Sequence, residues 1–386
     1  MGARLLFVSN GHGEIAIADR IAHDVHELAP DLPIDHLPLV GESRAADMRE
    51  VGPRRPMPSG GLIAMGNVTN IARDVRGGLI GLTLAQRRFL VRARGEYARA
   101  VAVGDTYALL MTLAARAPVT YVGTAKSVRV APYGPLERRV LRRADEVFVR
   151  DEPTAQRLRA QGVDARAPGN VIVDLFGSAD DPRADDACAG FVPMLAVFPG
   201  SRQSAYADAS FLLDVVGRIA DDRPALGAVL SIAPLLDPDV FAQRFARDGW
   251  HVDDLGDARM PFALRRGERV IARAWRGDIG PLLARAQMVI GQAGTANEAA
   301  AAAGVPIVAF ERDRDRKTAW YRMRQHGLLG EALLVLPGDP AQAAAGVGEL
   351  LDDPARRTSM GALGRERMGA PGGAHAIARS IVEAVA

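Results

Sequence analysis

The amino-acid sequence predicts an α/β protein of two doubly wound domains, each built on a parallel sheet with helices on both faces. Short apolar segments rich in Val, Leu and Ile alternate with amphipathic segments along almost the whole chain. This alternation restarts after residue 190, which indicates two sheets rather than one. The near-continuous apolar character of the strands is typical of parallel sheets that are buried on both faces. Because such sheets bind ligands at the carboxyl ends of their strands, we expect a cleft between the two domains.

Strand-like segments divide the chain into two Rossmann-like domains. The first half contains RLLFVS, IDHLPLV, RAVAVGD, VTYVGT and EVFVRD, and the second half contains MLAVFPG, GAVLSIAP, ERVIARA, MVIGQAG, VPIVAF and ALLVLPG. Residues 177–190 between them are polar and acidic without periodicity, which favours a linker. We therefore expect an N-terminal domain over 1–176 and a C-terminal domain over 191–352, followed by helices over 353–386 that pack back across the cleft.

The composition favours a soluble protein in a reducing compartment. The chain has 386 residues, a net charge of +2 and one cysteine, Cys188, so an intramolecular disulfide and a multi-cysteine metal site are both excluded. No uncharged run approaches the roughly 20 residues that a membrane-spanning helix needs. The sequence enters a strand almost at once, without a charged leader, so we expect no secretory signal and a cytoplasmic location.

An arginine-rich segment is the main charged feature. Residues 86–99 interleave arginines with apolar residues, and residues 61–94 contain several glycines but no good strand, so we expect two surface helices there. The whole segment 61–99 suits peripheral contact with an anionic membrane and reception of an acyl chain. A solvated helix face would give the same pattern. Nucleic acid is not expected as a partner, because acidic residues elsewhere cancel the positive field.

The opening segment LLFVSNGHGEIAIADRIA has the pattern of a strand, a glycine turn and an amphipathic helix. Gly11 and Gly13 would let a ligand approach the backbone where the N-terminus of the helix favours negative charge. His12 and Glu14 place two proton-transfer groups at this turn, and Asp105 follows another strand of the same domain. These three residues are therefore candidate catalytic groups.

Two other interpretations of this turn remain open. GHGEIA also satisfies the relaxed dinucleotide fingerprint G-x-G-x-x-A, for which Glu42 is the only fair candidate for an acidic residue closing the second strand. Dinucleotide turns usually place small or apolar residues between the glycines, which argues against this interpretation. Alternatively, His12 only caps the helix or packs against the sheet.

The second domain contains two turns of the phosphate-binding kind. In AVFPGSRQSAYAD a strand leads into Gly200, Ser201 and Arg202 before a helix, and an arginine beside a helix N-terminus suits phosphate. In VIGQAGTANEAAAAAGVPIVAF a second glycine turn opens an alanine-rich helix. Its backbone N–H groups can hold a diphosphate, and Glu298 can accept hydrogen bonds from ribose hydroxyls. The expected donor-binding residues of this second turn are Gln292, Gly294, Thr295, Ala296, Asn297 and Glu298.

In order and spacing, these motifs resemble the lipid-A-disaccharide synthases and their related proteins, a family of inverting glycosyltransferases with the GT-B architecture. The resemblance covers most of the chain, through SNGHGE, AMGNVTNIARDVRGGL, FVRDEPTAQRLRAQGVDARAPGNVIVD, FPGSR, AGTANEAAAAAGVPIV and RMGAPGGAHAIA. The chain departs from the synthases at Ala205 and Ala299, where they tend to carry glutamates, and around Asp105, where AVAVGDTYALLM replaces their acceptor motif. It is more similar to the related proteins than to the true synthases.

The resemblance implies a GT-B fold and transfer of a hexosamine-type sugar from a UDP-sugar to a lipid or lipid-like acceptor, with inversion. His12, Glu14 or Asp105 would be the base that deprotonates the acceptor hydroxyl. Arg202 and the N–H groups of both donor turns would stabilise the departing UDP. GT-B enzymes as a class work without a metal, so we expect no metal cofactor, and DRD at 313–315 is interpreted as a surface salt-bridge cluster.

Three alternative functions stay open on the sequence. A UDP-N-acetylglucosamine 2-epimerase shares the architecture and the donor site but needs no acceptor. A nucleotide-sugar-binding protein without turnover is suggested by the missing carboxylate at Ala205. A NAD-dependent enzyme is the third. An epimerase would convert a UDP-sugar alone, a transferase would need an acceptor to release UDP efficiently, and a binding protein would do neither.

Overall fold

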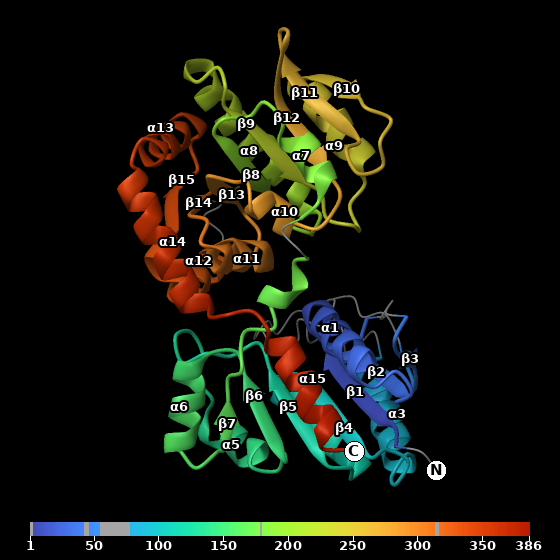
Figure 1. Cartoon of the computed structure of the whole chain (residues 1–386). Coiled ribbons are helices and arrows are strands. Elements are labelled where there is room, and N and C mark those ends of the chain that lie inside the picture. Colours follow the sequence, from blue (N-terminus) through green and yellow to red (C-terminus); the bar gives the residue numbers. More distant parts are fainter. Residues whose placement is uncertain (1–2, 42–45, 55–77, 178–179, 313–315) are drawn as a thin grey trace. The chain divides into compact units, whose positions relative to one another are not determined.

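The computed structural model describes the chain except for residues 1–2, 42–45, 55–77, 178–179 and 313–315. The chain forms two compact units, here called unit 1 and unit 2 (Figure 1). Unit 1 combines residues 1–175 with residues 370–386, and unit 2 consists of residues 176–369. Each unit contains one sheet flanked by helices, as the alternation of apolar and amphipathic segments predicts.

The sheet of unit 1 has seven strands in the order β3-β2-β1-β4-β5-β6-β7, and all neighbours are parallel. The strands are β1 Leu5–Asn10, β2 Ile34–Val40, β3 Arg49–Glu50, β4 Arg99–Gly104, β5 Val119–Gly123, β6 Glu146–Val149 and β7 Ala165–Arg166. The five strands that the sequence predicts in this half are present, and β3 and β7 are short additional edge strands. The order reverses between β1 and β4, which is the point where doubly wound sheets bind ligands.

Helices cover the sheet of unit 1 because each presents an apolar stripe to it. They are α1 His12–Leu28, α3 Leu79–Arg92, α4 Thr106–Thr112, α5 Pro135–Leu141, α6 Glu152–Ala160 and α15 Gly373–Glu383, with 3-10 turns at Leu113–Ala115 and Val173–Leu175. In α1 the buried stripe consists of residues three or four apart, including Ala18, Ile21, Ala22 and Val25. The last helix, α15, lies beside α1 although the two are far apart in sequence (Figure 1).

The C-terminal helices predicted over 353–386 are divided between the units. Helix α14, Pro354–Met368, belongs to unit 2, whereas α15 belongs to unit 1. Gly369 and Gly372 both adopt positive φ, which ends α14 and turns the chain before α15. The Asp174 carboxylate then accepts hydrogen bonds from the backbone N–H groups of Gly372 and Ala374, at 2.6 and 2.8 Å, and so fixes the start of α15.

The sheet of unit 2 has eight strands in the order β10-β11-β12-β9-β8-β13-β14-β15. The strands are β8 Met194–Phe198, β9 Gly227–Ser231, β10 His251–Asp254, β11 Phe262–Arg266, β12 Arg269–Trp275, β13 Met288–Gly291, β14 Ile307–Glu311 and β15 Leu333–Pro337. The six strands that the sequence predicts here are present and pair in parallel. Strands β10 and β11 are not predicted from the sequence. They extend the sheet from β12 in antiparallel orientation, with β10 at the edge; β10 reads HVDD, and β11 begins with the buried residues Phe262, Ala263 and Leu264.

The helices of unit 2 are α7 Pro182–Cys188, α8 Ser204–Asp222, α9 Pro238–Arg247, α10 Gly280–Leu283, α11 Thr295–Ala303, α12 Arg316–Leu329, α13 Pro340–Leu351 and α14, with a 3-10 turn at Gly330–Ala332. The prediction of a linker over 177–190 is wrong in its second part, because α7 forms there. The Asp181 side chain caps α7 by accepting from the N–H of Arg183, and Ala184 and Ala187 are buried as α7 contacts β9 and β12.

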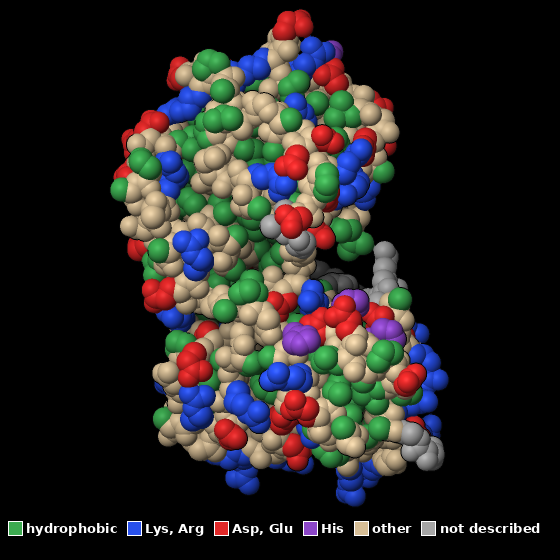
Figure 2. Space-filling view, in the orientation of Figure 1, with side chains coloured by type: hydrophobic (Ala, Val, Ile, Leu, Met, Phe, Trp, Pro, Cys, Tyr) green, Lys and Arg blue, Asp and Glu red, His purple; other side chains and the backbone are tan. Residues whose placement is uncertain are grey.

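The arginine-rich segment 86–99 is not one amphipathic helix. Helix α3 ends at Arg92, and Arg99 is already the first residue of β4, where it is buried and pairs with Glu146. Of the two helices predicted over 61–94, the structure shows α3, and the earlier part lies mostly outside the described residues. In the described part of the chain, no helix is long and apolar enough to cross a membrane. Basic and acidic side chains are interspersed over the visible face (Figure 2).

Candidate functional site

The carboxyl edge of the unit 1 sheet brings Asn10 and Asp105 together. Strands β1 and β4 are parallel neighbours, so the residues that follow them lie side by side. The Nδ2 of Asn10 donates to Oδ1 of Asp105 at 2.8 Å. The same oxygen accepts from the N–H groups of Tyr107 and Ala108, at 2.8 and 3.2 Å, and thereby caps α4. Asp105 is therefore oriented by three hydrogen bonds to one oxygen.

Glu14 lies close to Asp105, in the first turn of α1. Burial raises the pKa of Glu14 above its ordinary value, and the negative charge of Asp105 adds to this effect, whereas a hydrogen bond from the backbone of Glu14 itself acts against it. The structure thus brings together two of the three predicted catalytic residues. The third, His12, is the first residue of α1, and its side chain lies outside the described part of the structure.

The backbone conformation requires glycine at two positions of this edge but not at a third. Gly11 adopts φ +139°, and a Cβ there would lie 2.6 Å from Oε2 of Glu14. Gly104 adopts φ +131°, and a Cβ there would clash with Oδ1 of Asn10. The fold therefore requires both glycines. Gly13 is different, because it is exposed, has an ordinary helical backbone, and a Cβ there would meet no atom within 4 Å.

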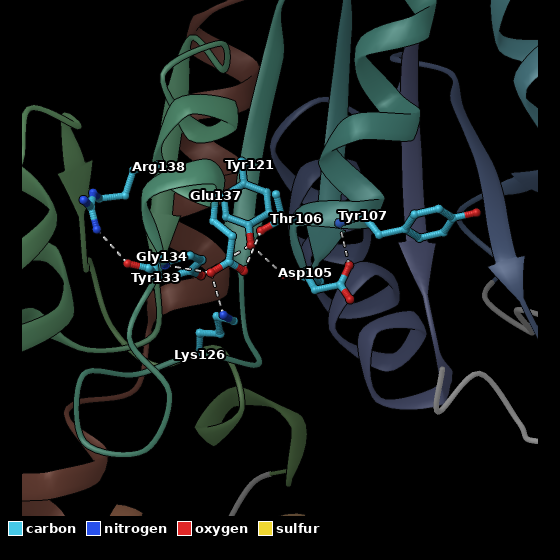
Figure 3. A network of polar contacts seen from close by, with 10 residues as sticks. Asp105, Thr106, Tyr107, Tyr121, Lys126, Tyr133, Gly134, Glu137 and Arg138 are labelled. Atoms are coloured by element: carbon cyan, nitrogen blue, oxygen red, sulfur yellow. Dashed lines mark hydrogen bonds and ion pairs between the residues drawn. The ribbon is translucent and has the colours of Figure 1, made fainter. Parts of the chain in front are cut away.

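A polar network around Glu137, which no sequence motif predicts, lies next to Asp105 (Figure 3). The Glu137 carboxylate accepts from Lys126 Nζ at 2.7 Å, from the backbone N–H of Gly134 at 2.8 Å and from the hydroxyl of Thr106 at 3.2 Å. Burial acts to raise the pKa of Glu137, but these hydrogen bonds and the charge of Lys126 outweigh it and hold this pKa below its ordinary value. Lys126 is one of only two lysines in the chain, and this rarity in an arginine-rich sequence could have marked it as a candidate site residue.

Two tyrosines connect this network to the end of β4. The hydroxyl of Tyr121 donates to the backbone carbonyl of Gly104 at 2.9 Å and lies 3.3 Å from the hydroxyl of Tyr133. Figure 3 shows both rings beside Glu137, while Tyr107 points away from them. The carboxyl edge of unit 1 therefore carries a connected set of polar groups from Asn10 to Glu137.

In unit 2, the two predicted glycine turns lie side by side. Strands β8 and β13 are parallel neighbours, with Phe198 opposite Gly291. The carbonyl of Phe198 accepts from the N–H groups of both Gln292 and Ala293, at 2.9 and 3.2 Å, which ties the second turn to the end of β8. Helix α8 begins after the first turn and α11 after the second, so the N-termini of two helices lie at the same edge.

The predicted residues of the first donor turn are accessible. Gly200 adopts φ +112°, which only glycine tolerates well, and a Cβ there would meet no atom within 4 Å. Ser201 and Arg202 follow it and are exposed. Both side chains are thus solvent-exposed at this edge.

The predicted residues of the second donor turn have different positions. Gly294 and Thr295 are exposed, whereas Ala296 and Glu298 are partly buried. Asn297 is fully buried, and its Nδ2 donates to the carbonyl of Gly291 at 3.3 Å, so this side chain holds the turn together. A Cβ at Gly294 would meet no atom within 4 Å, although its φ is an ordinary −87°, so the fold does not require glycine here.

The side chain of Gln292 is anchored on the neighbouring strand. Its Nε2 donates to the carbonyl of Phe310 in β14 at 3.1 Å, while its Oε1 is buried without a hydrogen-bond partner among the described residues. Such an atom is uncommon in a folded protein and calls for a partner. Among the described residues, no group of three or more His, Cys, Asp and Glu side chains could hold a metal ion, and the DRD segment lies outside them.

A Gly13→Ala variant tests whether a ligand approaches the first glycine turn. Because the added methyl group meets no atom and alanine loses less backbone entropy than glycine, the free energy of unfolding should rise by about 0.5–1 kcal/mol. Turnover should fall, because the methyl group occupies the space next to the backbone. Urea unfolding and kcat/KM measure the two effects. Gly11→Ala, with its clash against Glu14, should instead lower stability. Unchanged turnover of Gly13→Ala would mean that no ligand approaches this residue.

No protein-family model matches the chain, and none of the curated proteins matches its sequence. Solved structures match over almost its whole length. A UDP-GlcNAc 2-epimerase from Neisseria meningitidis bound to UDP-GlcNAc has a TM-score of 0.56 and 11% identity, covering 99% of each chain. The calicheamicin glycosyltransferase CalG4 has a TM-score of 0.60 and 15% identity, covering 100% of this chain and 98% of its own. MurG from Acinetobacter baumannii has a TM-score of 0.56 and 13% identity, covering 99% of each chain. With the two parallel sheets, these likenesses show that the chain has the GT-B fold that the sequence predicts.

Proposed function

We propose that the protein is an enzyme that acts on UDP-sugars, and more specifically a glycosyltransferase that moves a hexosamine-type sugar to a lipid or lipid-like acceptor with inversion. The observation that carries this proposal is the pair of glycine turns in unit 2, which parallel pairing of β8 and β13 holds side by side. Each turn opens a helix, and two helix N-termini at one edge favour a ligand with more than one negative charge.

The donor would bind through its diphosphate and its ribose. The backbone near Gly200 and Gly294 is open, so phosphate oxygens can approach the N–H groups there, and Arg202 supplies a positive charge. Glu298, in the first turn of α11, suits the ribose hydroxyls. A structure with the same fold contains UDP-GlcNAc, which supports this class of donor. No metal cofactor is needed in this scheme, because helix dipoles and the arginine stabilise the charge of the leaving UDP.

Glu14 is the residue that best suits the role of the base. Its raised pKa lies nearer to neutral pH than that of an ordinary carboxylate, which favours proton transfer. In the proposed step Glu14 takes the proton of the acceptor hydroxyl, the acceptor oxygen forms a bond to the anomeric carbon, and the bond from that carbon to UDP breaks. The negative charge of Asp105 would help to keep the pKa of Glu14 raised. Asp105 is held in place for this role by the three hydrogen bonds that its Oδ1 accepts. His12 is the alternative base.

A 2-epimerase is the second candidate function. It is favoured by the proximity of two carboxylates, Glu14 and Asp105, at one edge of unit 1, because proton removal and return on a sugar ring needs such groups. A UDP-GlcNAc 2-epimerase is also among the structures with this fold. It would act on the UDP-sugar without an acceptor.

The acceptor side of the proposal rests on α3. Ile80, Leu84 and Arg88 are spaced four residues apart and share one helix face, and Arg87 lies next to them. The exposed fractions are 59% for Ile80 and 48% for Leu84, and both arginines are also exposed. Exposed apolar side chains beside arginines suit peripheral contact with an anionic membrane at its cytoplasmic face, where a lipid acceptor would be reached.

The donor prediction is tested with ligands and products. UDP and UDP-GlcNAc should stabilise the protein against thermal unfolding and NAD should not, because a ligand at 100 times its dissociation constant adds about 2.7 kcal/mol. Product analysis with UDP-GlcNAc alone and with added lipid then separates the two enzymes. Conversion without an acceptor would replace the transferase with the epimerase, and stabilisation by NAD alone would contradict both.

A Glu14→Gln variant tests the base. Because folding holds the pKa of Glu14 above its value of about 4.5 in the unfolded chain, the ionised carboxylate lowers the free energy of unfolding at neutral pH. The variant should therefore be more stable than the wild type at pH 7, and this difference should disappear as the pH falls below 4.5. Turnover should fall by about 10²–10⁴-fold.

The matched control is His12→Asn, which keeps both carboxylates. If His12→Asn abolishes turnover and Glu14→Gln keeps it, the base is His12. Unfolding by urea at pH 7 and pH 4 gives the stabilities, and a pH profile of kcat/KM gives the pKa of the base in the free enzyme.

A vesicle-binding assay tests the acceptor side. Removing Arg87 and Arg88 together should weaken binding to phosphatidylglycerol vesicles by about 2 kcal/mol, or roughly thirty-fold, because each arginine near an anionic surface contributes about 1 kcal/mol. Removing two other exposed arginines of unit 1, Arg139 and Arg143, is the matched control and should change binding less. Equal loss in both double variants would show that α3 is not the contact surface.

A further inference from the structure

Helix α12 packs against the second glycine turn of unit 2. The Nε2 of Gln325 donates to the carbonyls of Ala293 and Gly294, at 2.9 and 3.3 Å. These carbonyls belong to the turn that opens α11, so one face of α12 lies at the carboxyl edge of the sheet. Arg322 precedes Gln325 by three residues and therefore lies on the same face of the helix.

Charged groups around Arg322 come from three other elements. They are Asp208 in α8, Glu311 at the end of β14 and Arg312 immediately after it. Arg312 forms an ion pair with Asp208 and stacks over the ring of Phe211, 4.6 Å from its centroid. The carboxylate of Asp208 is thus already neutralised by Arg312. Glu311 is then the carboxylate that remains to face the positive charge of Arg322.

One nitrogen of the Arg322 side chain lacks a hydrogen-bond partner in the described part of the chain. Its Nε is buried and has no hydrogen-bond partner among the described residues. Burial lowers the pKa of Arg322, and the nearby charge of Arg312 acts in the same direction, while Asp208 and Glu311 oppose it. The buried Oε1 of Gln292, at the start of the same turn, is unsatisfied too. Unsatisfied polar atoms destabilise a fold, so an acceptor from outside the chain would explain the Nε–H of Arg322, whereas the Oε1 of Gln292 needs a donor.

We propose that Arg322 is a specificity-determining residue that binds the diphosphate of the nucleotide between the two glycine turns of unit 2. This inference rests on the proposed function, because it assigns a role within the donor site. A guanidinium that is held at the edge of two helix N-termini can bind two phosphate oxygens in the bidentate manner of arginine. Arg322 and the exposed Arg202 would then act on the diphosphate together.

If Arg322 binds the diphosphate, its removal should weaken binding of UDP but not binding of uridine, which has no phosphate. Calorimetric titration of Arg322→Ala should show binding of UDP weakened by about 10- to 100-fold relative to the wild type, because hydrogen bonds between charged groups are the strong ones. Binding of uridine should change less than twofold. The ratio of the two affinities is the decisive readout, because a purely structural role of Arg322 would weaken both ligands together.

Two further variants keep the test sharp. Arg322→Lys retains the charge without the planar fork and should recover part of the lost UDP affinity; it also replaces Arg322→Ala if that variant does not fold. Arg218→Ala removes an exposed arginine from α8 and should leave UDP binding unchanged. If the wild type binds no UDP, the proposed function fails. If the wild type binds UDP and Arg322→Ala binds it equally well, only the role of Arg322 is overturned.

Discussion

Parallel pairing of neighbouring strands determines where the candidate catalytic residues and the two glycine turns of this protein lie. Because parallel neighbours end at the same edge of a sheet, residues that are far apart in sequence become adjacent there. In unit 1 the pairing of β1 with β4 brings Asn10 to Asp105. In unit 2 the pairing of β8 with β13 joins the two glycine turns, through the single carbonyl of Phe198. The chemistry that the protein can perform depends on these two pairs of strands.

Some glycines at these edges are required by the fold, whereas others are explained only by the approach of a ligand. Gly11 and Gly104 have positive φ, and a side chain at either would collide with a neighbour. Gly13 and Gly294 meet neither condition, so folding alone leaves them unexplained. Since glycine within a helix is normally unfavourable, its presence at position 13 agrees with the close approach of a substrate to the backbone. The sequence motif alone does not show which of its glycines the fold requires, and the structure does.

The sequence was sufficient for the framework and insufficient for its polar details. Apolar runs such as MLAVF at β8 identify buried parallel strands directly, which is why two doubly wound domains could be predicted; the GT-B architecture was implied by the family resemblance. Strand β10, His251–Asp254, reads HVDD and is an edge strand, so it has no apolar run to detect. Asn297 has the sequence pattern of a donor-binding residue, but the sequence does not reveal that its side chain is fully buried and bonded to the carbonyl of Gly291. The network around Glu137 depends on contacts between separate segments, and no local pattern reveals these.

The division of the chain between the units has a consequence for biosynthesis. Unit 2 is one continuous segment, whereas unit 1 needs α15, which is made almost 200 residues after the rest of that unit. On the ribosome, unit 2 can therefore complete its fold while unit 1 still exposes the apolar face of α1 that α15 covers. Unit 2 can therefore fold before unit 1, although most of unit 1 is synthesised first. The incomplete unit 1 has to stay soluble until α15 emerges.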